Sequence, residues 1–180
     1  MTGGQQDDRV GIAVLGCGRI GRMHAGLLAR QPGVRLAAVF DVVAEVAGAV
    51  AAEHGTVAAA SAEAVLAMPE VDAVLIATPT TTHVPLIEAA ARAGRPILCE
   101  KPIDLDTARA TACWERIAER HPVVMIGFNR RFDPSFRALR ERLEAGEIGT
   151  LEQLSIISRD PAPPPASYVA GSGGLFRDMT

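Results

Sequence analysis

Hydrophobic and polar positions divide most of this chain into two alternating kinds of segment. Short apolar runs occupy residues 10–15, 36–40, 71–77, 96–99 and 123–127, with a weaker run at 57–59. Stretches with helical spacing lie between them, at 20–30, 43–53, 84–93 and 106–120. Continuous apolar runs are typical of strands buried on both faces. Because helices separate them, we predict a doubly wound α/β fold with a parallel sheet over residues 1–128.

The pattern changes from residue 129 onward. Asp133 followed by Pro134 is typical of a helix start. The apolar residues that follow have helical spacing, and Gly146 is a plausible end of that helix. This segment therefore predicts a helix outside the parallel sheet, at the start of a second domain over residues 129–180.

The last part of the chain predicts little regular structure. Residues 151–158 alternate in part between apolar and polar, which favours a strand with one solvated face. The prolines of 161–165 predict a stiff extended loop, and Gly173-Gly174 resembles the entrance to a helix. One half-exposed strand is not stable alone. We therefore expect an incomplete α+β domain, with a mobile tail after about Thr150.

Composition and charge narrow the class of protein. Hydrophobic residues make up 48% and charged residues 22% of the 180 residues, as in globular proteins. The net charge of −3 indicates no basic surface for nucleic acid or an anionic membrane. The polar start is unlike a signal peptide, and the three cysteines have no metal-binding spacing. We expect a cytoplasmic protein with no metal, nucleic-acid or membrane partner.

A glycine-rich motif follows the first predicted strand and opens the first predicted helix. Residues 16–21 read Gly-Cys-Gly-Arg-Ile-Gly, which is the pattern G-x-G-x-x-G. In this context Gly16 permits a tight turn, Gly18 permits close approach of a pyrophosphate, and Gly21 permits close helix packing. The helix amino terminus adds amide donors and a positive dipole. The motif predicts a Rossmann-type dinucleotide-binding fold, although a glycine turn of another α/β protein is the alternative.

Asp41 ends the second predicted strand, about 20 residues after the motif. A carboxylate at this position can accept hydrogen bonds from the adenosine ribose, and it would repel a 2′-phosphate. Val42 and Val43 supply no cation. The sequence therefore favours NAD over NADP.

Lys101 lies in the triplet Glu100-Lys101-Pro102, at the carboxyl end of a predicted strand. Ligands of open α/β sheets bind at these ends. A lysine beside the nicotinamide ring can hydrogen-bond a substrate hydroxyl or assist the departure of its proton. The alternative is a surface lysine paired with Glu100.

Several other polar residues follow predicted strands. The hydroxyls and backbone of the loop 78–83 can line a cofactor, whereas we expect His83 rather to cap the next helix. His24 fits packing or a position near the ribose. Arg130 and Arg131 can hold a polyol or form salt bridges between the two domains. Cys17 and Cys99 are expected to be buried, without a redox role.

Taken together, four segments resemble the glucose-fructose oxidoreductase / inositol dehydrogenase (Gfo/Idh/MocA) family. They are residues 16–21, 77–83, 100–102 and 127–132, and the resemblance covers the chain from about Val10 to Thr180. The tail, at 158–165 and 172–180, is most similar to the inositol 2-dehydrogenases of that family.

The resemblance implies a Rossmann domain followed by a domain with an open, mostly antiparallel sheet. It implies NAD-dependent oxidation of a ring hydroxyl of a cyclic polyol, chiefly myo-inositol to its 2-keto form, by a homo-oligomer. The family's catalytic lysine and aspartate match Lys101 and Asp178, and its catalytic histidine would fall beyond Thr180. We therefore expect this chain alone to bind NAD without oxidising inositol.

The site residues implied in this way form two sets. The cofactor-binding set is Gly16, Gly18, Arg19, Ile20, Gly21, Asp41, Thr78, Pro79, Thr80, His83, Glu100 and Lys101. The substrate-contacting set is Lys101, Arg130, Asp160 and Asp178. Two alternatives stay open: a family dehydrogenase for a sugar or another inositol isomer, and a non-catalytic NAD-binding sensor or scaffold.

Overall fold

The computed structural model describes residues 8–159, 162–164 and 166–174, and they fall into two compact units that divide between Ile126 and Gly127. Within these residues, no helix combines the length and the apolar character needed to cross a membrane.

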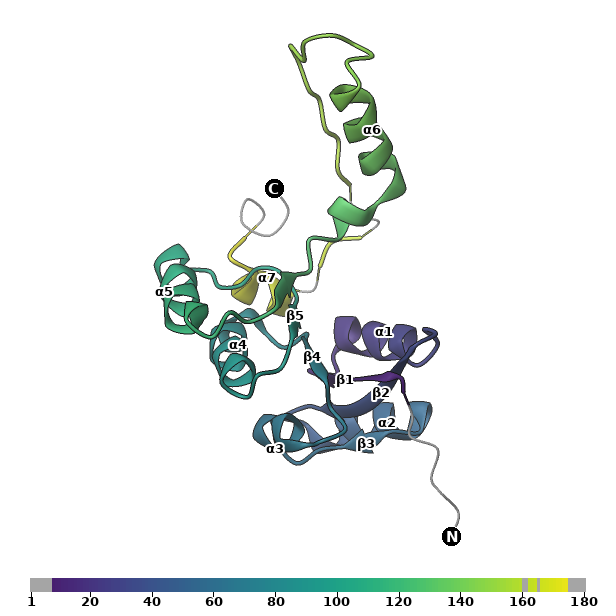
Figure 1. Cartoon of the computed structure of the whole chain (residues 1–180), viewed down its shortest axis with the longest axis vertical. Helices are drawn as coiled ribbons and strands as arrows, with labels where there is room; N and C mark the ends of the chain where they lie inside the picture. The colour runs from purple at the N-terminus through teal and green to yellow at the C-terminus, as the bar shows by residue number, and fades with distance from the viewer. Residues whose placement is uncertain (1–7, 160–161, 165, 175–180) are drawn as a thin grey trace. The chain divides into compact units, whose positions relative to one another are not determined.

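The first unit is built on a six-stranded sheet in the order β3-β2-β1-β4-β5-β6, and every neighbouring pair is parallel (Figure 1). The strands are β1 Val10–Leu15, β2 Val34–Phe40, β3 Val57–Ala58, β4 Ala73–Ile76, β5 Ile97–Cys99 and β6 Val124–Ile126. The direction of winding reverses between β1 and β4, which is the switch point where doubly wound sheets bind ligands. The doubly wound parallel fold expected from the sequence is confirmed.

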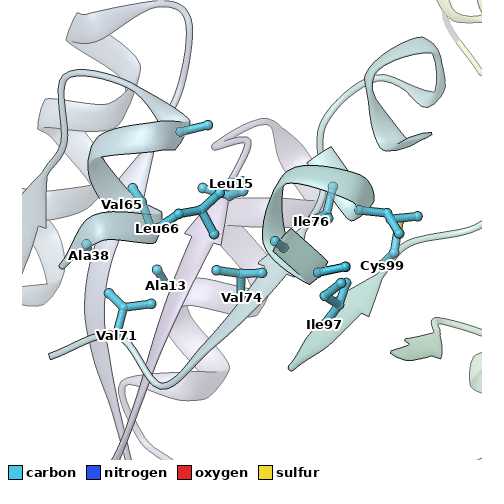
Figure 2. Close-up of a cluster of buried hydrophobic side chains, with 14 of the residues drawn as sticks. Ala13, Leu15, Ala38, Val65, Leu66, Val71, Val74, Ile76, Ile97 and Cys99 are labelled. Carbon is cyan, nitrogen blue, oxygen red and sulfur yellow. The ribbon is translucent and has the colours of Figure 1, made fainter. Parts of the chain in front are cut away.

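Helices cover both faces of this sheet. They are α1 Arg19–Leu28, α2 Ala44–His54, α3 Ala62–Ala67, α4 His83–Arg92 and α5 Thr107–Ala118. Successive side chains of a strand point to opposite faces. Ala13 and Leu15 of β1 therefore join the buried cluster that includes α3, α4 and α5 (Figure 2). Val14 joins the cluster with α1 and α2 on the other face. This explains why the strands read as continuous apolar runs.

The carboxyl ends of β1, β2, β4, β5 and β6 lie side by side at one edge of the sheet. Leu15, the last residue of β1, pairs with Phe40 of β2 and with Ile76 of β4. Cys99 of β5 pairs with Ile76 and with Ile126 of β6. The last residues of five parallel strands are thus in register. The loops that follow them all leave from one edge of the sheet.

Helix α3 was not predicted from the sequence. It has only six residues, too few to show a helical period among alanines. Its start is marked by Ser61, whose hydroxyl accepts the Ala64 amide at 3.1 Å. Asp106 caps α5 in the same way, through the Ala108 amide at 2.8 Å. Local side-chain caps, rather than apolar spacing, define these two helix starts.

The second unit contains the short helix η2 at Asn129–Phe132, followed by α6 at Pro134–Glu144 and α7 at Ala166–Ser172. The predicted start of α6 is confirmed: the Asp133 carboxylate accepts the amides of Ser135 at 2.9 Å and Phe136 at 3.2 Å.

One prediction for the tail is wrong. Residues 151–158 form no strand, and they are exposed, because the described part of the chain provides no neighbouring strand for their backbone groups. Gly173 and Gly174 follow α7 with positive φ values of 80° and 85°, a conformation that ends helices. The helix expected after them would fall on residues 175–180, which lie outside the described residues. Helix α7 itself was not predicted.

Candidate cofactor-binding and active site

The glycine-rich turn follows β1 at the switch point of the sheet. The Gly16 amide donates to the Phe40 carbonyl at 2.7 Å, which joins the turn to the end of β2. Gly16 has a φ of 92°, and a methyl group there would lie 2.6 Å from the Ala77 carbonyl oxygen. Glycine is therefore required by the backbone conformation and by the close approach of the end of β4.

The other two glycines of the motif differ in what surrounds them. A methyl group at Gly21 would overlap the Gly16 carbonyl oxygen, so Gly21 serves the packing of α1 against the turn. A methyl group at Gly18 would meet no atom within 4 Å. Gly18 is exposed and has ordinary helix-cap angles, so nothing within the described protein explains its lack of a side chain. The open space fits a close approach by a pyrophosphate.

Helix α1 begins at this open position. Arg19 and Ile20 begin its first turn, which contains no acidic residue, and its cap Gly18 makes no side-chain hydrogen bond. The amides and the positive end of the helix dipole therefore face no protein carboxylate in that turn. An anionic phosphate group is well matched to this helix end.

Asp41 follows β2 and is fixed by the backbone next to the turn. Its Oδ2 accepts the Cys17 amide at 2.7 Å, and its Oδ1 accepts the Val43 amide at 2.9 Å. Each carboxylate oxygen keeps a second lone pair, so the group can still accept ribose hydroxyls. Val42, 90% exposed, brings no cation to offset a 2′-phosphate. This arrangement matches the NAD preference expected from the sequence.

Replacing Asp41 with asparagine is expected to weaken NAD binding about 10-fold and to reduce the preference over NADP, because a charge-assisted acceptor is lost. Calorimetric titration with both nucleotides measures the change. Asp72→Asn is the matched control, since Asp72 also accepts a backbone amide, that of Gly11, but at the start of β4. An equal loss in both variants would contradict a specific contact of Asp41 with the ribose.

Glu100 and Lys101 follow β5 at the same sheet edge. The Glu100 amide donates to the Ile76 carbonyl at 2.9 Å, and its carboxylate contacts His24 Nε2 at 2.8 Å. That hydrogen bond lowers the pKa of Glu100, with smaller contributions from the charge of His24 and from the amide and charge of Lys101, against the effect of burial. Lys101 is partly exposed beside an ionised carboxylate, and the Lys101–Pro102 peptide bond is cis.

Lys101 is also the only lysine in the chain. Apart from the histidines, every other basic side chain is an arginine. Among the side chains, a compact ammonium group that can lose a proton therefore occurs once, after β5, whereas arginine keeps its charge at any ordinary pH.

The loop after β4 contains the short helix η1, Thr80–Thr82, and leads into α4. Thr78 and Thr80 are half-buried and Pro79 is exposed. Thr82 Oγ1 lies 2.7 Å from the Pro79 carbonyl oxygen and 2.8 Å from the Thr78 hydroxyl. These contacts shape the loop that faces the glycine turn through Ala77.

The sequence predicts that His83 caps the helix after it, and this prediction is wrong. The cap residue is Thr82, and the His83 ring is buried with 1% exposure. Its Nδ1 lies 2.7 Å from the Pro102 carbonyl oxygen, and its Nε2 lies 2.8 Å from that of Thr78. A ring in this position can act on a cofactor only through the backbone that it holds. Sequence reasoning missed this role, because the two partners are distant along the chain.

The remaining expected site residues are Arg130, Asp160 and Asp178. Arg130 belongs to the second unit, where its guanidinium lies over the Phe136 ring at 5.6 Å. Asp160 and Asp178 lie outside the described residues.

The cysteines are buried, as expected. Burial and the nearby Asp41 carboxylate raise the pKa of Cys17 to about 11. Burial and the neighbouring Glu100 raise that of Cys99 to about 12. Both thiols stay protonated and unreactive near neutral pH.

A parallel sheet with a glycine turn at its switch point and an acid after β2 defines a dinucleotide-binding protein of the Rossmann class. The sequence profile described as "Oxidoreductase family, NAD-binding Rossmann fold" (GFO_IDH_MocA) matches residues 10–128. The chain belongs to this family, and NAD is the family's cofactor. The resemblance noted in the sequence is confirmed.

Known relatives agree with this assignment. An inositol 2-dehydrogenase from Rhizobium meliloti is 47% identical over 171 residues, which cover 95% of this chain and 52% of the relative. A solved myo-inositol dehydrogenase from Corynebacterium glutamicum is 51% identical, with a TM-score of 0.88 and coverage of 95% and 51%. A scyllo-inositol dehydrogenase from Lactobacillus casei, solved with NAD(H) and scyllo-inositol, is 31% identical, with a TM-score of 0.73 and coverage of 78% and 42%. The chain spans about half the length of the curated relatives it matches.

Proposed function

We propose that this chain provides the cofactor site and the catalytic lysine of an NAD-dependent dehydrogenase that oxidises a ring hydroxyl of a cyclic polyol, myo-inositol to its 2-keto form. The observation that carries the proposal is the register of the strand ends, which brings the glycine turn, Asp41 and Lys101 to one edge of the sheet. The inositol dehydrogenases among the relatives support the substrate class.

The cofactor would be held by groups described above. The amides of the turn and of α1 would bind the pyrophosphate, with Gly18 leaving room for it, and Asp41 would accept the ribose hydroxyls. Further cofactor contacts are proposed for Thr78, Pro79, Thr80, Glu100 and Lys101, all in loops after β4 and β5. When bound, NAD supplies the hydride acceptor for the reaction.

Lys101 would act on the substrate hydroxyl. Its ammonium group can donate a hydrogen bond to the reacting oxygen and stabilise negative charge there as the proton leaves. The ionised Glu100 beside it balances that charge when no substrate is present. Asp178 is proposed as a second catalytic residue, and Arg130 and Asp160 as contacts to other hydroxyls, from the family resemblance alone.

The test is NADH formation by a polypeptide that contains this chain and continues through the second domain of the relatives. Myo-inositol, scyllo-inositol and D-glucose are compared as substrates. Turnover of myo-inositol above the others supports the proposal. Preference for D-glucose would identify a sugar dehydrogenase instead, and NAD binding without turnover of any polyol would favour a sensor or scaffold.

Two further proposals accompany this function: a homo-oligomeric assembly of the full-length enzyme, and a cytoplasmic location. Both follow from the family resemblance and from the sequence composition, and both stay predictions.

A further inference from the structure

We propose that His24 and His83 are positioning residues for Lys101, and that they act by holding the residues on either side of it. The inference rests on the proposed catalytic function of Lys101. The two histidines come from different helices, α1 and α4, and reach the segment 100–102 by separate hydrogen bonds.

His24 holds the residue before the lysine. Its Nε2 lies 2.8 Å from Glu100 Oε1, and the two side chains are 19% and 25% exposed. Glu100 is linked to Lys101 by their shared peptide bond, and the Lys101 amide is among the groups that lower the pKa of the Glu100 carboxylate. A continuous path therefore runs from α1 through His24 and Glu100 to the backbone of residue 101. Because α1 begins at the glycine turn, this path joins the proposed cofactor site to the lysine.

His83 holds the residue after the lysine. Its ring contacts the Pro102 carbonyl oxygen through Nδ1 and the Thr78 carbonyl oxygen through Nε2. The ring is almost fully buried, so these contacts do not compete with water. Residue 102 is thereby joined to the loop after β4, which borders the glycine turn.

Residues 100–102 need such support because they have no regular secondary structure. They lie in the loop that connects the end of β5 at Cys99 to the start of α5 at Thr107. The lysine side chain has four flexible carbons, so the position of its amine depends first on where its backbone is held. A displacement of about 1 Å at a reacting group lowers rates about 100-fold. Hydrogen bonds on both sides restrict this displacement without occupying the amine.

The enzyme test uses His24, whose side chain is less buried than that of His83. In the full-length polypeptide, His24→Leu is expected to lower kcat about 30-fold, with KM for NAD changed less than about 2-fold. His24→Gln keeps a donor for Glu100 and is expected to recover part of kcat. His121→Asn is the matched control, because His121 is exposed beyond α5 and has a φ of 46°, which asparagine tolerates. A normal kcat in His24→Leu would overturn the proposal.

A double-mutant cycle tests whether His24 acts through Glu100. Both residues lie on one path, so their effects should not add. The kcat of the double variant His24→Leu/Glu100→Gln is expected to equal that of whichever single variant has the lower kcat. Additive losses would show that His24 affects turnover by another route, which contradicts the path through Glu100. His83→Gln, where it folds, is expected to lower kcat in the same manner.

A measurement on the 180-residue chain separates this inference from the proposed function. Hydrogen exchange at the Lys101 amide is expected to accelerate at least about 10-fold in His24→Leu and not in His121→Asn. Unchanged exchange would overturn the positioning of residue 101 whatever the enzyme does. Faster exchange, with no polyol oxidised by the unaltered full-length protein, would contradict the proposed function and leave the hydrogen-bonded path established.

Discussion

Replacing Lys101 with methionine is expected to lower kcat for myo-inositol oxidation about 1,000-fold in the full-length polypeptide. Methionine keeps the apolar length of the side chain and removes the amine that would bind the reacting oxygen, and groups that handle protons contribute about 100- to 10,000-fold to rates. NAD affinity is expected to change less than about 3-fold, because the turn, α1 and Asp41 are unaffected. Steady-state kinetics and calorimetric titration with NAD measure the two effects.

Two comparison variants sharpen this result. Lys101→Arg keeps a positive charge in a group that cannot lose its proton, so a large loss there assigns a proton-handling role to the amine. Arg120→Met removes an exposed cation beyond the end of α5 and is expected to change nothing. Normal turnover in Lys101→Met would remove the lysine from the mechanism.

Gly18→Ala is expected to lower the affinity for NAD, whereas Gly21→Ala is expected to lower the stability of the protein. At Gly18 the added methyl group meets no protein atom within 4 Å, so the protein folds normally. The methyl group then lies where the pyrophosphate would approach, and NAD affinity is expected to fall at least about 10-fold. At Gly21 the methyl group overlaps the Gly16 carbonyl oxygen, and the unfolding free energy is expected to fall by about 3 kcal/mol or more.

Thermal unfolding and NAD titration of the two variants form the test. A Gly18→Ala protein with normal NAD affinity would contradict the assignment of the turn as a pyrophosphate site. A Gly21→Ala protein as stable as the original would contradict the packing described for α1.

Much of the first unit could be predicted because its elements depend on local sequence. Buried parallel strands need apolar residues on both faces, and the glycine turn has a fixed spacing, so both are visible in one dimension. The strand expected at 151–158 was wrong because alternation creates a strand only where another strand pairs with it. Helix α7, which precedes Gly173 and Gly174, was missed because a pair of glycines marks the end of a helix as readily as a start.

The contacts of the site were harder to predict. His24 and Glu100 are separated by 76 positions along the chain, and His83 and Pro102 by 19. No periodicity or spacing reports such pairs. They become visible only when the register of β1, β4 and β5 brings the strand ends together. The alternative interpretation paired Glu100 with Lys101, and the structure adds the His24 ring as a partner of the Glu100 carboxylate.

The single lysine of this chain has a practical consequence for handling the protein. Amine-reactive dyes, cross-linkers and activated resins react with lysine side chains and the amino terminus, and here the only side-chain amine is at position 101. In a preparation attached to a surface through its amines, every molecule that did not react at the amino terminus would thus be attached at the proposed reaction centre. The buried cysteines offer no convenient substitute. An affinity tag joined to a terminus is the attachment that leaves this sheet edge unmodified.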